Sequence, residues 1–187
     1  MHPEARMNLQ MNEPLPGFDR PLEVLRACHR RLKGCLETLD RLQAHVPDHG
    51  ADAEAQAAAQ RLLKYFHASA PHHHADEDED LFPRLKGLGH HPDCHPQLPD
   101  WLDRLTAEHE TLENGWSRLE PALLDIAEGR DASLDGAAEW IDQYRRHLAL
   151  EEEAVLPLAE HLLDADQCRA IGESMARRRD LEPEPHG

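Results

Sequence analysis

Apolar residues recur at steps of three and four along most of the chain, which is the pattern of helices that bury one face. Such stretches follow one another at residues 21–46, 51–86, 100–127 and 137–163. Turn-forming segments rich in glycine, proline and polar residues separate them. We therefore expect an all-α protein, an up-down-up-down four-helix bundle with an N-terminal arm and a short extra C-terminal helix.

Glycine and proline mark the expected boundaries. Pro71 falls inside the second apolar stretch and predicts a kink or a break there. Residues 87–99 contain two glycines and three prolines and predict a loop, after which Asp100 is the expected cap of the third helix. The expected organisation is a mobile arm at residues 1–17, a bundle at residues 18–163, and a short helix with a loose tail at residues 164–187.

Composition supports this fold and narrows the partners. The apolar 40% of the chain is mostly leucine and alanine, with few aromatic or β-branched residues, which favours helices over strands. A formal net charge of −17 argues against nucleic-acid binding, because that function needs a basic face. The basic run at residues 177–179 is interpreted as a solvated helix end.

Cysteine usage and the absence of long apolar runs indicate the compartment. The cysteines form no CxxC pair and no zinc-ribbon spacing; they are Cys28, Cys35, Cys94 and Cys168. No stretch approaches the length of a membrane span, and the first 18 residues have no signal-peptide apolar region. We expect a soluble, cytoplasmic protein with reduced cysteines and no membrane partner.

Two segments share the skeleton His, three residues, Glu, five residues, Pro, at residues 73–83 and 147–157. A third His-x-x-x-Glu lies at residues 109–113. Positions i and i+4 share one face of a helix, so each pair directs an imidazole and a carboxylate toward the same point. A lone His29 occupies an apolar slot of the first helix.

The spacing of these histidines predicts one common height. The midpoints between residues 29, 73, 109 and 147 are residues 51, 91 and 128, each at or beside a predicted turn. Residues equidistant from a turn lie at the same level of an up-down bundle. All four histidines should therefore lie in one layer inside the bundle.

Seven polar residues occupy stripes that are otherwise leucine, alanine and aromatic, and these are the candidate metal ligands: His29, His73, Glu77, His109, Glu113, His147 and Glu151. An unpaired buried carboxylate costs several kcal/mol, whereas a whole domain is stable by only about 5–15 kcal/mol. Metal ions are the simplest source of positive charge to compensate the buried carboxylates. A set of imidazoles and carboxylates without thiolate suits iron or manganese, and seven ligands suit two metals that share bridging carboxylates.

These motifs together resemble the hemerythrin-like family, also called HHE cation-binding domains, over roughly residues 20–162. The resemblance implies a four-helix bundle with two non-haem iron ions, oxo- or hydroxo-bridged, that meet dioxygen, peroxide or nitric oxide. It also implies that Glu77 and Glu151 bridge the irons. His29 and His73 would then belong to one iron. His109, His147 and Glu113 would belong to the other.

Glu113 departs from the oxygen-carrying members of that family, which have histidine at this position. An extra carboxylate favours ferric over ferrous iron and argues against reversible oxygen carriage. It favours irreversible oxidation, peroxide or nitric oxide chemistry, or iron sensing. Whether the chain is an enzyme stays open, and a non-catalytic iron or oxygen sensor or iron-binding module is the alternative, as is a metal-free acidic interaction protein.

Several assignments stay open on sequence alone. Leu112 fits the third apolar stripe as well as Glu113 does, and Tyr65 or Tyr144 can serve as a hydrogen-bond donor or ligand. The acidic neighbours Asp78 and Glu152 are interpreted as solvated. The residues His90, His91, Cys94 and His95 are interpreted as a surface loop, with a second metal site as the alternative.

Overall fold

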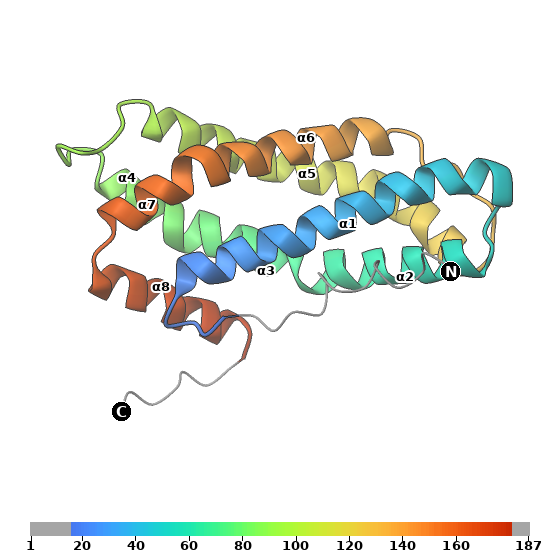
Figure 1. Ribbon diagram of the computed structural model, residues 1–187, viewed down its shortest axis with the longest axis horizontal. Coiled ribbons are helices and arrows are strands. Elements are labelled where there is room, and N and C mark those ends of the chain that lie inside the picture. The colour runs from blue at the N-terminus through green and yellow to red at the C-terminus, as the bar shows by residue number, and fades with distance from the viewer. Residues whose placement is uncertain (1–15, 181–187) are drawn as a thin grey trace, which may run out of the picture.

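Helices account for the regular secondary structure of residues 16–180, the part of the chain that the computed structural model describes (Figure 1). No strand occurs among these residues, so the prediction of an all-α protein is confirmed for them. The expected arm at residues 1–17 and the end of the expected tail from residue 181 fall almost entirely outside the described residues. None of the described helices is both long and apolar enough to cross a membrane.

The helices are, in order, α1 (Pro21–His49), α2 (Ala53–Ala68), α3 (Ala70–Ala75), the π-helical segment η2 (Asp76–Leu81), α4 (Phe82–Gly87), α5 (Leu98–Ala127), α6 (Ala137–Leu150), the π-helical segment η3 (Glu151–Val155), α7 (Leu156–Leu162) and α8 (Ala165–Arg178). The break predicted at Pro71 is confirmed, because α2 ends at Ala68 and Pro71 lies in the first turn of α3. The predicted cap at Asp100 is wrong. Helix α5 begins at Leu98, since Pro99 is compatible with a first helical turn.

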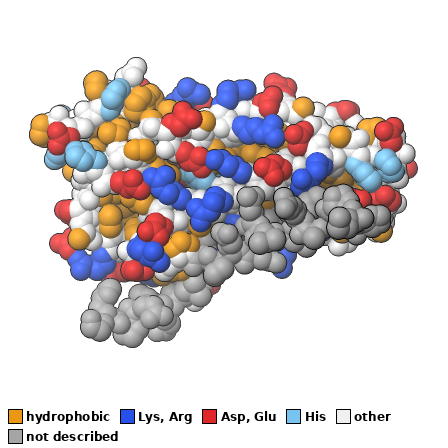
Figure 2. All heavy atoms as spheres, viewed as in Figure 1, with side chains coloured by type: hydrophobic (Ala, Val, Ile, Leu, Met, Phe, Trp, Pro, Cys, Tyr) orange, Lys and Arg blue, Asp and Glu red, His pale blue; other side chains and the backbone are white. Residues whose placement is uncertain are grey.

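The long helices enclose a shared interior. Helix α1 packs against α2 and α6, α2 packs against α5, and α5 packs against α6, so each has two neighbours around one axis (Figure 1). Acidic and basic side chains are interspersed on the face shown in Figure 2. The apolar stripes face inward, while most charged residues remain in contact with water.

The interior contains two hydrophobic clusters rather than one. One includes Leu32, Leu112 and Leu148, and the other includes Leu25 and Leu105, each with further buried partners. Along α1 and α5, the boundary between the clusters falls at the positions of the two buried histidines. A buried polar layer therefore separates the two cores.

Helix α8 crosses one end of the molecule, beside the start of α1 (Figure 1). Asp164 begins it with a capping box, in which Asp164 and Gln167 each accept a hydrogen bond from the other's backbone N–H. Ile171 and Met175 are buried in the second hydrophobic cluster. Gly172 allows the close approach, because a Cβ atom there would lie 1.8 Å from the carbonyl oxygen of Phe18.

We predict that Gly172→Ala destabilises the protein by about 1–3 kcal/mol, because the added methyl group overlaps rigid backbone. Gly87→Ala is the matched control, since a Cβ at Gly87 meets no atom within 4 Å. Urea unfolding followed by circular dichroism measures both changes. Equal stability of the two variants would show that α8 does not pack closely on the start of α1.

Candidate metal centre

Six of the seven candidate ligands meet in the polar layer between the two hydrophobic cores. Four neighbouring helical runs supply them: α1 supplies His29, α3 and η2 supply His73 and Glu77, α5 supplies His109, and α6 and η3 supply His147 and Glu151. All six are buried. Their ligand atoms form two groups that share Glu151, with the atoms of each group within 4.8 Å of one another.

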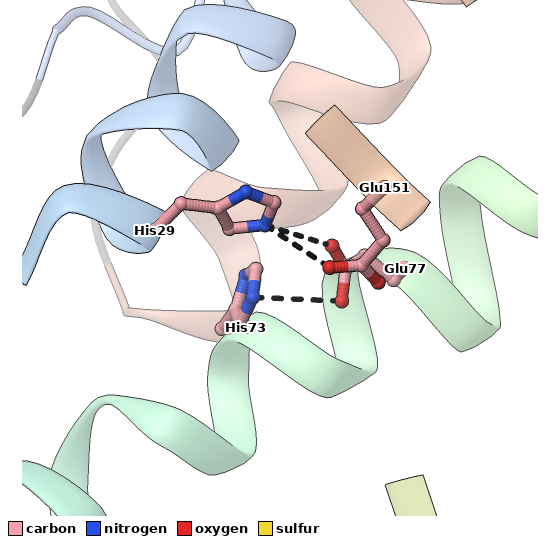
Figure 3. Close-up of side chains that lie close together, drawn as sticks. All are labelled: His29, His73, Glu77 and Glu151. Atoms are coloured by element: carbon pink, nitrogen blue, oxygen red, sulfur yellow. Dashed lines mark ion pairs between the residues drawn. The ribbon is translucent and has the colours of Figure 1, made fainter. Parts of the chain in front are cut away.

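The first group contains His29, His73, Glu77 and Glu151, whose side chains point toward one another (Figure 3). The Nε2 atom of His29 lies 3.5 Å from Oε1 of Glu77 and 3.4 Å from Oε2 of Glu151. The Nε2 atom of His73 lies 3.6 Å from Oε2 of Glu77. Two imidazoles and two carboxylates thus face a common centre.

The second group contains His109, His147 and Glu151. Its two Nε2 atoms lie 3.1 Å apart, and Nε2 of His147 lies 3.1 Å from Oε1 of Glu151. Two nitrogens about 3 Å apart are spaced as ligands of one metal at roughly right angles, with bonds of about 2.1 Å. Oε2 of Glu77 also lies 3.4 Å from Nε2 of His109, so each glutamate reaches both groups.

Both glutamates begin or lie within a widened helical turn. The backbone N–H of Phe82 donates to the carbonyl of Glu77, and that of Leu156 donates to the carbonyl of Glu151, each across five residues instead of four. The next residue in each case is a proline, Pro83 or Pro157, which has no N–H for the usual bond and crowds the preceding turn. Because a proline follows at the same position in both segments, the widening occurs twice. Such π-turns are frequent at functional sites.

The donor set fits metal ions because its polar atoms lack other partners. The Nε2 atom of His29, both ring nitrogens of His73, and both carboxylate oxygens of Glu77 and Glu151 are buried without a hydrogen bond. Leaving buried carboxylates unsatisfied is strongly unfavourable. Cations between the carboxylates and the Nε2 atoms would satisfy both kinds of group at once.

Three of the four histidines also face an outer carboxylate through Nδ1. The distances are 3.3 Å from His29 to Glu152, 2.8 Å from His109 to Asp78, and 3.1 Å from His147 to Glu108. Such carboxylates orient a metal-binding imidazole and make its other nitrogen a stronger ligand. The interpretation of Asp78 and Glu152 as simply solvated is therefore wrong.

The sequence did contain a signal for these outer carboxylates. Each is adjacent in sequence to a residue of the layer, as Asp78 is to Glu77, Glu108 to His109 and Glu152 to Glu151. On a helix, neighbouring residues point about 100° apart, so the neighbour of an inward ligand faces an adjacent helix. Each acidic residue therefore meets a histidine of a different helix.

Glu113 is the candidate ligand that the structure does not bring into the layer. Its side chain is 64% exposed, and its Oε1 lies 3.3 Å from Nδ1 of His74. His74 is buried instead, stacks on the ring of His109 at 4.2 Å between centroids, and shares a 2.7 Å hydrogen bond with the hydroxyl of Tyr144. The inward side of α5 at this level is occupied by Leu112, the other residue that fitted the stripe.

The remaining sequence candidates lie outside the two groups of ligand atoms. Tyr65 donates a 3.4 Å hydrogen bond to the carbonyl of Cys28. His90, His91, Cys94 and His95 lie in the loop at residues 88–97, outside both groups. Among residues 16–180, the groups of possible metal ligands therefore lie in the central layer, and none lies in this loop.

The outer and inner carboxylates set the proton affinity of three histidines. Burial lowers the pKa of His29, but Glu152, Glu77 and Glu151 outweigh it and raise the pKa to about 9. For His109, burial is likewise outweighed by Asp78, Glu77 and Glu151, and the pKa rises to about 10. For His147, burial is outweighed by Glu151 and Glu108, and the pKa rises to about 9.

His73 and Glu77 behave differently from these three. His73 faces no outer carboxylate, and burial lowers its pKa to about 3. Burial alone would raise the pKa of Glu77, but His73, His109 and His29 hold it well below its usual range. In the absence of metal, protons on three histidines would therefore balance the buried carboxylates.

Comparison with known proteins gives an independent description of the chain. The family model described as hemerythrin HHE cation binding domain matches residues 20–159. An uncharacterized protein of Haemophilus influenzae (strain ATCC 51907 / DSM 11121 / KW20 / Rd) is 30% identical over 178 residues, which is 93% of this chain and 99% of that protein. The matched region contains all six residues of the layer.

We predict that the metal-free protein loses stability as the pH rises from 7 to about 9. His29, His109 and His147 keep protons in the folded state that an unfolded histidine, with a pKa of about 6.5, has already lost. The folded state then binds more protons, so its stability falls with rising pH, by about 2–5 kcal/mol over this window. Urea unfolding at pH 7, 8 and 9 in the presence of a chelator measures the free energy of unfolding of the metal-free protein. A free energy that stays constant over this range would contradict the raised pKa values.

Proposed function

Because the chain belongs to the hemerythrin HHE cation-binding family, we propose that it holds two non-haem iron ions in a carboxylate-bridged centre that binds or reacts with dioxygen, peroxide or nitric oxide. The observation that supports this most directly is the pair of buried groups of ligand atoms that share Glu151. Two adjacent ions with a common carboxylate explain that sharing, whereas one ion does not.

In this proposal, His29 and His73 bind one ion, and His109 and His147 bind the other. Glu77 and Glu151 bridge the ions, since each places oxygens near histidines of both groups. Glu113 is not a ligand in this assignment, because its carboxylate is largely exposed and lies against His74. The centre thus has four imidazoles and two carboxylates.

The donor set favours iron over zinc. Structural zinc sites are usually tetrahedral and often contain cysteine, whereas imidazole and carboxylate together suit iron or manganese. The nearest thiol in sequence belongs to Cys28, which lies outside both groups of ligand atoms. The four cysteines, all free in the structure, fit the reducing cytoplasm in which we place the protein.

When bound, a di-iron centre supplies electrons and open coordination positions to a small oxidant. The side chains of the protein then fix the geometry. Glu108, Asp78 and Glu152 hold the Nδ1 side of three ligands, so that Nε2 faces the metals. The hydrophobic clusters on both sides of the layer limit the entry of water, which favours small uncharged ligands.

The fold that we propose for this function is an up-down-up-down four-helix bundle at residues 18–163. It is made of α1, the run from α2 to α4, α5, and the run from α6 to α7, with α8 as an extra helix. The packing of each long helix against two neighbours supports this arrangement. The order of the chain around the axis places each pair of successive helices side by side.

A non-catalytic iron or oxygen sensor is the second candidate. It is favoured by the position of the layer between the two hydrophobic clusters, since loss of metal there would leave buried charge in the middle of the bundle. Its signature would be a large drop in melting temperature on chelation without consumption of peroxide or nitric oxide. Turnover of either molecule would favour the first candidate.

The function is tested by metal analysis of the anaerobically purified protein, followed by exposure to dioxygen, peroxide and nitric oxide under optical monitoring. We predict about two irons per chain and a near-ultraviolet charge-transfer band after oxidation. Glu151→Gln should lose at least one iron, because one bridging oxygen is removed. Glu113→Gln, the matched control, should keep both.

Two results would count against this proposal. If neither the isolated nor the iron-reconstituted protein holds iron, the two-iron centre is wrong. If Glu113→Gln loses as much iron as Glu151→Gln, the assignment of ligands is wrong. Circular dichroism of each variant separates loss of metal from loss of fold.

We also predict that Glu108→Gln weakens iron binding by about 10–100-fold, because His147 loses the carboxylate at its Nδ1 atom. Glu110→Gln is the control, since Glu110 is an exposed residue two positions further along the same helix. Competition with a chelator of known affinity measures both. Equal affinities would show that the outer carboxylate does not support the ligand.

A further inference from the structure

The C-terminal end of α8 is joined to the segment that carries Glu77. Arg178 pairs through Nη1 with Asp76, and through Nη2 with Glu79 and Asp80 at 2.8 Å each. Arg179 places Nη1 and Nη2 at 3.1 and 2.6 Å from the two carboxylate oxygens of Asp76. The interpretation of this basic run as a solvated helix end is therefore wrong for two of its three arginines.

Burial makes these contacts stronger than ordinary surface ion pairs. The side chain of Asp76 is fully buried, and those of Arg178 and Arg179 are only 14% and 13% exposed. Charge-assisted hydrogen bonds to a desolvated carboxylate are strong, and removal of one partner leaves a buried charge without compensation. Asp76 directly precedes Glu77, so its position constrains the backbone of a bridging residue.

Helix α8 also contacts the start of the helix that carries His29. Gly172 lies against the backbone of Phe18, and the guanidinium of Arg179 lies 5.6 Å from the centre of the Phe18 ring. One short helix therefore touches both α1 and η2, which come from distant parts of the sequence. Helix α8 itself lies outside residues 20–159, the region that the family model matches.

We propose that α8 controls how firmly the centre retains metal, with Arg178 and Arg179 as positioning residues that hold η2, and with it Glu77, against α1. Release of the arginines leaves Asp76 without its partners, so η2 opens and Glu77 withdraws from the ions. Movement of α8 is then a route by which iron is released without unfolding of the bundle. This inference rests on the proposed two-iron function.

The test compares Arg178→Gln/Arg179→Gln with Arg177→Gln in the full chain. Arg177 is the matched control, because its side chain is 65% exposed and its nearest acidic partner, Glu173, lies 4.0 Å away on the same helix. We expect the double variant to release iron to a chelator at least tenfold faster than wild type. In the metal-free protein, amide hydrogen exchange of residues 76–81 should also accelerate at least tenfold, while exchange in α5 is unchanged.

Asp76→Asn is the second variant, and it leaves Arg178 paired with Glu79 and Asp80, so α8 stays docked. It should accelerate iron release relative to wild type but by less than the double variant does, because Arg178 still holds η2 through Glu79 and Asp80 and no buried charge is left unpaired. Unchanged release and exchange in either variant would overturn the role of α8 while the two-iron function stands. A wild-type protein that takes up no iron would overturn both.

Discussion

The structure depends on two buried carboxylates, Glu77 and Glu151, that face four imidazoles between two hydrophobic clusters. Neither carboxylate has a hydrogen-bond partner, and their ion-pair neighbours are histidine rings. Such a layer is unfavourable unless positive charge is present within it. Protons on the histidines can supply this charge, and metal ions would supply it in the proposed centre, so the occupant of the layer would link the fold to its function.

The same constraint explains the arrangement of charge around the layer. Outer carboxylates face three of the histidines at Nδ1, so that Nε2 points inward. The two glutamates lie in π-helical turns that are each followed by a proline. Beside Glu77, the buried Asp76 is paired with Arg178 at the end of α8 and with Arg179 directly after it. The central carboxylates therefore face imidazoles, and three of these imidazoles face an outer carboxylate on their other side. Helix α8 is the part of this arrangement that lies nearest an end of the chain.

Helix positions and most of the central layer were predictable from the sequence, because both follow from local periodicity and from the spacing between turns. The sequence did not decide whether Leu112 or Glu113 points inward, because these adjacent residues fit the stripe equally well. Only the packing of the helices shows that Leu112 does. The roles of Asp78, Glu152 and Arg178 were missed for a related reason. Their partners lie on other helices. Adjacency to an inward residue indicates that Asp78 and Glu152 face a neighbouring helix, but periodicity along one helix does not identify the residue that they meet there.

The most direct test of the central claim is anomalous diffraction from crystals of the iron-loaded protein, measured on both sides of the iron absorption edge. The account predicts two iron peaks roughly 3.5–4 Å apart within the layer. One should lie beside Nε2 of His29 and His73, the other beside Nε2 of His109 and His147, with Glu77 and Glu151 between them. A layer without anomalous signal, or iron bound only at the surface loop of residues 88–97, would contradict it.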